Sequence, residues 1–294
     1  MFHQSVRVRS LLPFCFLLTV ALLSLTPLTA RNQPKQERPP HTEEQRQARE
    51  ALNRGVQNFR NARIEDAIGD FARAKQLDPQ LLNARLYLAM SYASLYIPGA
   101  SEEIQQKGQA AIAEFRGVLA MQPENLSAID GIGAMLFQMG GQPFDAGKFA
   151  ESRTFNQRHI EISPQDPEPY YWIGVIDWTL SFRANSELRM HFNQQVAGGK
   201  LSDTHPLPPD LRAQYAREYG PMIDEGIASL KQATALRPDY DDAMAYLNLL
   251  YRRKADTVAT PAERDQLNRM ADELVNKVKE IKQSRSIAAL QQQN

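Results

Sequence analysis

A helical pattern that closes on a proline recurs along the chain and restricts what the chain can fold into. In its first copy Ala67, Phe71 and Ala74 are spaced by four and three residues, which places them on one face of a helix. Asp78 precedes Pro79, and the residue before a proline avoids the helical region, so the helix is predicted to end there. Similar segments end at Pro123, Pro164 and Pro238. A chain that repeats one helical unit in this way is expected to stack those units side by side.

Each closing helix has a predicted partner helix upstream. The partner helices share a small residue at a similar place, at Gly55, Ala89, Gly133 and Gly174. Glycine inside a helix costs ~1 kcal/mol relative to alanine, so its recurrence indicates that a neighbouring helix approaches closely there. The sequence therefore predicts helix pairs over about 48–80, 82–124, 126–165, 167–239 and 241–283.

This pattern resembles the tetratricopeptide repeat (TPR), a helix–turn–helix unit of about 34 residues with a closing proline. The first unit carries the resemblance best, at Gly55, Ala67, Phe71, Ala74 and Pro79. The resemblance implies an all-α, right-handed α-solenoid of about five TPR-like helix-turn-helix pairs over residues 45–283. A C-terminal capping helix is expected from Pro261 to Gln283, and the tail over 284–294 is expected to be frayed.

The closing prolines are farther apart than that unit length. The intervals from Pro79 to Pro123, then to Pro164 and then to Pro238, are 44, 41 and 74 residues. We expect the extra residues between the two helices of a pair, near 96–100, near 140–143 and as a long insert over 180–219. In the insert we expect a loop over 180–207, followed by a helix that kinks at Pro221 and continues to Leu236.

The first thirty residues have the layout of a secretory signal peptide. Arg7 and Arg9 precede an apolar run from Leu11 to Leu25, and small Ala30 follows before a polar stretch. The run is short for a membrane-spanning helix, which needs ~20 residues. We therefore expect a signal peptide over 1–30, a flexible linker over 31–44, and an exported bacterial protein that is periplasmic or secreted. An uncleaved inner-membrane anchor is the alternative; the mature chain would have no membrane span.

Composition and motifs favour neither catalysis nor nucleic-acid binding. Lys plus Arg and Asp plus Glu both number 34, so no excess of positive charge is present to bind nucleic acid. The only cysteine, Cys15, lies in the predicted signal peptide, and no two histidines are spaced by three or four residues. We therefore predict no enzyme activity, cofactor, metal or catalytic residue. His159, at a position where the family prefers alanine, is expected to be a packed histidine.

Two segments resemble binding motifs without matching them. Residues 141–149 look like a phosphate-binding loop, but the glycine spacing is too long and Phe149 replaces the serine or threonine, so a turn between helices is favoured. Asp239, Asp241 and Asp242 could suggest a metal site, but we expect Asp239 or Asp241 to cap the helix that follows and the other acids to lie favourably near its dipole.

The family register supplies a candidate binding surface. In TPR arrays the first helix of each pair lines the concave face, and the resemblance implies that apolar and aromatic side chains line it here. The candidate groove residues are Leu52, Phe59, Leu86, Met90, Phe137, Tyr171 and Trp178. Such a groove suits a peptide or a helix, and the insert over 180–219 either covers it or leaves it open.

The sequence thus predicts a non-catalytic scaffold or adaptor of the cell envelope whose partner is a protein or peptide segment. Two alternatives stay open. One is a structural envelope component that associates with itself. The other is a small-ligand binder or hydrolase that uses the 180–219 insert.

Overall fold

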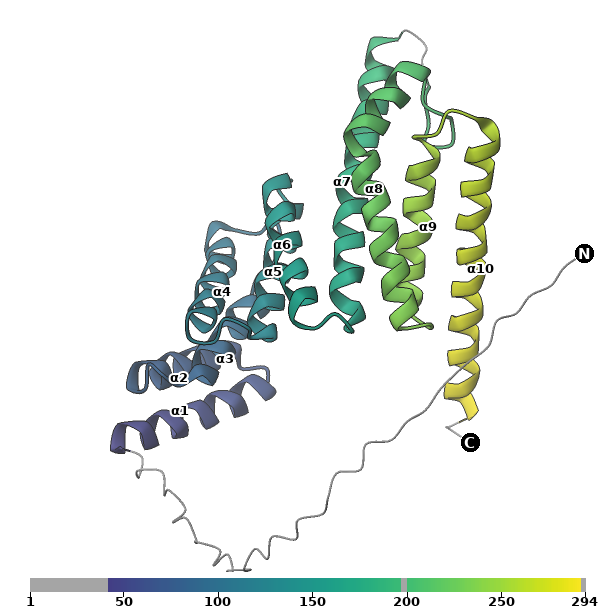
Figure 1. Cartoon of the computed structure of the whole chain (residues 1–294). Helices are drawn as coiled ribbons and strands as arrows, with labels where there is room; N and C mark the ends of the chain where they lie inside the picture. Colours follow the sequence, from purple (N-terminus) through teal and green to yellow (C-terminus); the bar gives the residue numbers. More distant parts are fainter. Residues whose placement is uncertain (1–41, 197–199, 292–294) are drawn as a thin grey trace, which may run out of the picture. The chain divides into compact units, whose positions relative to one another are not determined.

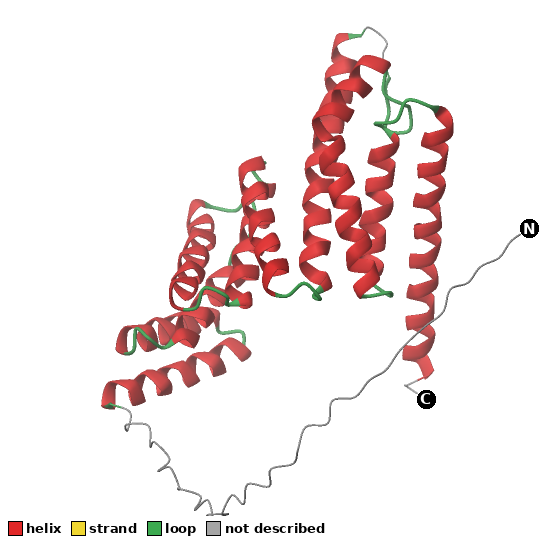
Figure 2. Ribbon diagram, viewed as in Figure 1, coloured by secondary structure: helices red, strands yellow, loops and turns green. Residues whose placement is uncertain are grey.

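The computed structural model describes residues 42–196 and 200–291. The predicted signal peptide over 1–30 and most of the predicted linker lie outside the described residues. Ten helices and no strand are found in the described part, so the predicted all-α class is confirmed (Figures 1 and 2). Among these ten, none is both long and apolar enough to cross a membrane.

The helices follow one another in pairs. Their bounds are α1 (Glu43–Arg60), α2 (Ile64–Leu77), α3 (Leu82–Ser94), α4 (Glu102–Met121), α5 (Leu126–Gly141), α6 (Ala146–Ile162), α7 (Pro167–Gln195), α8 (Pro209–Leu236), α9 (Asp241–Ala255) and α10 (Pro261–Gln291). Each helix packs mainly against its partner within a pair, which joins α1 with α2, α3 with α4, α5 with α6, α7 with α8 and α9 with α10. This succession of local contacts is the predicted α-solenoid of five helix pairs.

Side-chain caps fix where several helices begin. Thr42 caps α1 in a reciprocal arrangement with Gln45, so α1 begins at Glu43, inside the predicted linker. Asp145 accepts hydrogen bonds from the backbone N–H groups of Gly147 and Lys148 in the first turn of α6, so the turn predicted in the segment 141–149 spans residues 142–145. Asp166 caps α7 in the same way, accepting from the Glu168 backbone N–H at 2.9 Å.

The glycines of the repeat allow close approach in two pairs. Phe71 on α2 is fully buried, and its ring lies where a side chain on Gly55 would project: a Cβ there would be 2.5 Å from Phe71 Cε1. Gly174 on α7 is covered in the same way by the Leu230 side chain on α8. The predicted packing reason for these two glycines is therefore confirmed.

The insert is mostly helical, which corrects the predicted loop over 180–207. α7 continues to Gln195, and only residues 196–208 connect it to α8 (Figure 1). The segment is polar, but Ala184 and Leu188, one turn apart, pack on the core, and Arg183 pairs with Glu187 at 2.8 Å. α8 then runs through Pro221 to Leu236 as a single helix, in agreement with the predicted helix end.

A buried polar network fastens the end of the insert. The Arg189 guanidinium on α7 donates to the backbone carbonyls of Ser202 and His205 at 2.6 and 2.8 Å. It also donates to Asp256 Oδ1, at the end of α9, at 3.0 Å and to Asn185 Oδ1 at 2.7 Å. The connecting segment is thereby tied to both α7 and α9, and its charged groups are paired.

The C-terminal helix is longer than predicted. The expected frayed tail over 284–294 is wrong for residues 284–291, which belong to α10, while 292–294 lie outside the described residues. Arg285 donates to Asp241 Oδ1 at 2.7 Å and to the Asp239 carbonyl at 2.5 Å. The expected side-chain cap is wrong, because Tyr240 is the N-cap of α9 and no side chain caps it, whereas Asp241 and Asp242 do lie in the first turn of α9, as expected for acids near the helix dipole.

Candidate functional site

Aromatic rings from α5 to α9 form one connected set, the aromatic surface. Neighbouring ring centroids lie 5.1 to 5.8 Å apart, mostly in edge-to-face, tilted or stacked geometry. Phe149 and Tyr240 are buried and support the rings above them, and the full set is Phe137, Phe144, Phe149, Tyr171, Trp172, Trp178, Phe182, Tyr240 and Tyr246. Each such ring pair contributes about 0.5–1.5 kcal/mol beyond its buried area, so the set is held rigidly.

The predicted groove residues separate into two groups. Phe137, Tyr171 and Trp178 belong to the aromatic surface, so the structure brings these three together with Trp172 and Tyr246 between them. The other four lie in the first two helix pairs: Leu52, Phe59 and Leu86 are half-buried against the core clusters there, and Met90 is 41% exposed.

The α7 extension adds exposed apolar side chains that the sequence reading missed. Phe182 is 37% exposed and stacks on Trp178, and Met190 is 47% exposed. Together with Phe144 and Phe149 they line a hollow of about 430 Å³ beside the α5–α6 turn. Phe182 follows Trp178 by one helical turn, a signal that was hidden because this segment was expected to be a loop.

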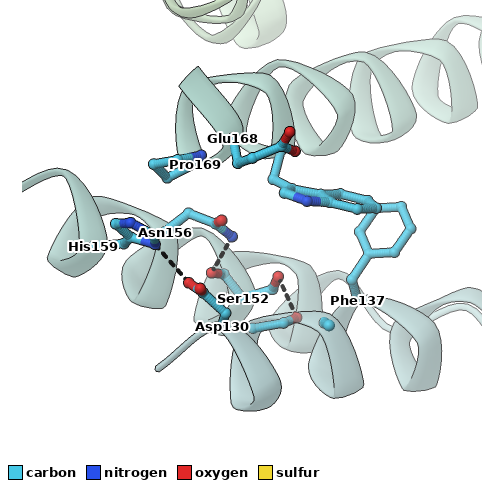
Figure 3. Close-up of a pocket in the computed structure, with 10 residues that line it drawn as sticks. Asp130, Phe137, Ser152, Asn156, His159, Glu168 and Pro169 are labelled. Atoms are coloured by element: carbon cyan, nitrogen blue, oxygen red, sulfur yellow. Dashed lines mark hydrogen bonds and ion pairs between the residues drawn. The ribbon is translucent and has the colours of Figure 1, made fainter. Parts of the chain in front are cut away.

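A second, more polar hollow of about 210 Å³, the His159 pocket, lies between α5, α6 and α7. α6 contributes Ser152, Asn156 and His159 to its lining. Asp130 and Phe137 reach it from α5, and Glu168 and Pro169 reach it from α7, as Figure 3 shows. Trp172 on α7 also lines the pocket, and its ring centroid is 5.3 Å from that of Phe137. Three helices therefore converge on one small cavity with an aromatic wall and a polar wall.

The three α6 side chains of this pocket are buried and polar. Ser152 Oγ donates to the Gly133 carbonyl at 2.8 Å, and Asn156 Nδ2 donates to the Ser152 carbonyl at 3.0 Å. His159, only 3% exposed, places Nδ1 at 2.6 Å from Asp130 Oδ1. Its Nε2 has no hydrogen-bond partner among the described residues. His159 is thus packed, as predicted, but its Nε2 forms no hydrogen bond within the described part of the chain.

The register of the repeat explains why polar groups occupy this place. Ala67, Phe71 and Ala74 lie 12, 8 and 5 residues before Pro79. At the same distances before Pro164 the chain has Ser152, Asn156 and His159. Asn156 thus stands where the first unit has a phenylalanine, and the shorter side chain leaves open the space that the ring fills there. Counting back from each closing proline would have revealed this set from the sequence.

Carboxylates surround the mouth of the His159 pocket. Asp130, half-exposed, has its pKa raised by burial, an effect that the hydrogen bond from His159 opposes. Glu168 accepts from Arg237 at 2.8 Å and from the Tyr240 hydroxyl at 2.7 Å. Asp166 Oδ2 lies 3.4 Å from His159 Nε2. Three carboxylates therefore face one guanidinium and one imidazole, and the mouth has an excess of negative charge.

A separate buried carboxylate lies between α6, α7 and α8. Asp177 on α7 is fully buried, accepts from Arg153 Nε at 3.2 Å, and has a second oxygen without a hydrogen-bond partner in the described part. Arg153 also pairs with Glu225 of α8. Burial raises the pKa of Asp177 to about 7, although Arg153 opposes the shift. No group of three or more potential metal ligands is found among the described residues.

The fold is shared with solved structures, although no family model and no curated protein sequence matches the chain. MamA from Desulfovibrio magneticus RS-1 (residues 41 to the end) is 15% identical over 83% of this chain and 98% of that chain, with a TM-score of 0.54. A crystal structure of a MamA protein is 12% identical over 82% and 94% of the two chains, with a TM-score of 0.53. Identities this low establish the fold alone. The chain thus has the helix-pair solenoid fold that its resemblance to the tetratricopeptide repeat implied.

Proposed function

We propose that the chain is a non-catalytic scaffold or adaptor that binds a segment of another protein along the aromatic surface. The observation that carries the proposal is the continuous run of rings from Phe137 to Phe182, which ends in exposed Phe182 and Met190 beside a hollow of about 430 Å³. Aromatic and methionine side chains are enriched in protein-binding surfaces, and exposed apolar patches commonly mark them.

The properties of this hollow support an apolar segment as the ligand. Its apolar lining is Phe144, Phe149, Phe182 and Met190, and polar side chains that include Arg183 and Glu187 complete it; the Arg183 guanidinium lies 4.4 Å from the centroid of the Phe144 ring. A rigid aromatic floor loses little entropy when a ligand binds, and methionine adapts to the shape of an incoming side chain. We therefore assign the hollow to an apolar or aromatic anchor residue of the bound segment.

We further propose that this scaffold acts in the bacterial cell envelope. The support is the N-terminal sequence, in which Arg7 and Arg9 precede the apolar run Leu11 to Leu25 and then Ala30. Expression of the full chain in a bacterium, followed by fractionation and intact-mass measurement, tests this point. Recovery from the periplasm or medium with cleavage near Ala30 is the expected outcome, and recovery of the uncleaved chain from the cytoplasm would contradict it.

The binding proposal is tested by selecting a displayed library of random peptides on the purified chain. Selected peptides are expected to carry apolar or aromatic residues and to lose at least about tenfold in affinity on Phe182→Ala or Met190→Ala, as measured by fluorescence anisotropy. Both side chains are exposed, so the fold is expected to survive, which circular dichroism checks.

Ile287→Ala is the matched control, because Ile287 is an exposed apolar residue of α10 far along the chain from this surface. Equal losses in the control and in Phe182→Ala would contradict the assigned surface. A selection that returns no binders, together with a mass that rises with concentration in light scattering, would favour the self-associating alternative instead.

A further inference from the structure

We propose that the His159 pocket receives a single basic side chain, lysine or arginine, of the segment that the aromatic surface binds. The inference rests on the proposed function and adds a charge requirement to it. It is carried by the size of the pocket, the chemistry of its polar wall, the charge at its mouth and its aromatic wall.

The size of the pocket limits what it can hold. Sites for whole small molecules and cofactors commonly have about 300–1,000 Å³. The His159 pocket has about 210 Å³, which suits one long side chain rather than a complete ligand. Its mouth is accessible, because Asp130 and Ala134 on α5 are exposed. A side chain of a peptide lying across α5 and α7 therefore has a route inward.

The polar wall offers acceptors. Asp130 Oδ1 accepts a hydrogen bond from His159 Nδ1 at 2.6 Å, and Nε2 is the ring nitrogen that Asp130 does not contact. This nitrogen is buried without a hydrogen-bond partner among the described residues, and the nearest carboxylate oxygen, Asp166 Oδ2, lies 3.4 Å away. Lysine and arginine carry only donors, so either one can donate to the carboxylate oxygens of Asp130 and Asp166 beside this ring.

The charge around the pocket selects the sign of the ligand. Asp130, Asp166 and Glu168 are acidic, and Arg237, which pairs with Glu168 and also interacts electrostatically with Asp166, offsets one of these three negative charges. An ammonium or guanidinium group is attracted to this excess of negative charge, whereas a carboxylate or phosphate group is repelled. The pocket therefore favours a basic side chain and disfavours an acidic peptide end.

The aromatic wall suits a cation as well. Phe137 and Trp172 meet at 5.3 Å between ring centroids and line the pocket opposite the α6 polar groups. The face of an indole attracts a cation, and the aliphatic stem of lysine or arginine packs on apolar surface. A basic side chain thus matches both walls, whereas an apolar side chain would bring no counter-charge to the carboxylates at the mouth.

Small side-chain mimics test the pocket without knowledge of the partner. The chain has two tryptophans, so in Trp178→Phe the fluorescence reports on Trp172 alone. Titration of this protein with n-butylammonium or n-butylguanidinium is expected to change the emission with roughly millimolar saturation. The neutral probe 1-butanol and the anion butyrate, at the same concentrations, are expected to bind at least about tenfold more weakly. Cations that bind no better than 1-butanol would overturn the proposal.

Two substitutions test whether n-butylammonium binds in the His159 pocket. Asp130→Asn is expected to weaken n-butylammonium binding several-fold, whereas Asp224→Asn, an exposed acid on α8, leaves it unchanged. Asn156→Phe restores the ring of the first repeat unit, so it is expected to fill the cavity and abolish cation binding while the melting temperature is kept or raised. Unchanged cation binding in Asn156→Phe would also overturn the proposal.

An experiment with the selected peptides distinguishes the proposed peptide-binding function from the proposed basic-residue pocket. Each peptide selected on the chain is resynthesised with its basic residue replaced by norleucine or citrulline, and this change is expected to weaken binding about tenfold to the original chain but not to Asn156→Phe. If Phe182→Ala weakens peptide binding but replacing the basic residue of the peptide does not, the scaffold proposal is supported and the proposal of a basic-residue pocket is rejected. If n-butylammonium binds and no peptide does, the cation-binding pocket is supported and the proposed peptide-binding function is rejected.

Discussion

At the scale of single residues, two glycines of the first helix pair differ in what a methyl group would meet. On α1, a Cβ at Gly55 would be 2.5 Å from the buried Phe71 ring, whereas a Cβ at Gly69 on α2 has nothing within 4 Å. Gly55→Ala is therefore expected to lower the free energy of unfolding by about 1–3 kcal/mol through overpacking. Gly69→Ala is expected to raise it by about 0.5–1 kcal/mol, because alanine favours the helix. Urea unfolding measures both.

Gly133→Ala is the informative comparison within the repeat. Gly133 has the register position of Gly55, but its nearest side-chain atom is Asn156 Nδ2 at 3.5 Å from an added Cβ, an ordinary contact distance. We expect Gly133→Ala to be close to neutral. If Gly133→Ala lowers the free energy of unfolding as much as Gly55→Ala does, the third unit does not have the open space that replaces the Phe71 ring of the first unit.

Asp177 gives a pH dependence whose sign follows from its raised pKa. Burial holds the pKa near 7 in the folded chain against an ordinary value of 3.8, so between these pH values the folded state keeps a proton that the unfolded state has lost. This group therefore makes stability fall as pH rises from about 4 to about 7, by at most about 1.4 kcal/mol per pH unit, and adds no further change above that.

Asp177→Asn is expected to remove this contribution. The difference in unfolding free energy between the variant and the unmodified chain should grow in favour of the variant from pH 4 to pH 7 and then level off, as measured by urea unfolding at a series of pH values. Arg153 keeps Glu225 as a partner in the variant. Parallel pH profiles for the two proteins would show that Asp177 titrates normally.

At the scale of elements, the insert shows how a buried cation organises a connection. Arg189 donates to the carbonyls of Ser202 and His205, while Asp256 still has Arg253 within 3.4 Å. Arg189→Leu is therefore expected to release the connection without leaving Asp256 unpaired. The Leu201 and His205 amides, which are hydrogen-bonded now, should exchange with solvent faster by at least about tenfold.

Arg217→Leu is the control for that measurement, because Arg217 is an exposed residue of α8 whose nearest carboxylate is 3.7 Å away. Hydrogen exchange in the 200–207 segment should stay unchanged in this variant. If Arg189→Leu also leaves the segment unchanged, the network does not hold the connection in place.

The element boundaries also show how far local sequence signals reach. Closing prolines and capping residues such as Asp166 act within a few residues, and the helices that they delimit were predicted. The segment 180–195 was mistaken for a loop because its polar composition concealed Ala184 and Leu188. These become a helical face only because α8 and its neighbours offer a core for them to pack on.

At the scale of the whole described molecule, contacts join each helix to the next one or two along the chain, so a perturbation should stay local. Gly55→Ala is expected to speed hydrogen exchange in α1 to α3 and to leave α7 to α10 unchanged. Leu230→Ala removes the side chain that packs on Gly174. It is expected to speed hydrogen exchange in α7 to α10 and to leave α1 to α3 unchanged. A uniform increase across all the helices in either variant would indicate a single cooperative unit instead.

The sequence by itself determined the helical class, the pairing of helices and the place of each closing proline, because helical period and proline geometry act over a few neighbouring residues. Only the tertiary structure decided which side chains meet. His159 and Asp130, or Phe137 and Trp172, lie on different helices, and no local pattern states that they touch. The His159 pocket arises because Asn156 is too short to fill the space between three helices, and that depends on how those helices pack.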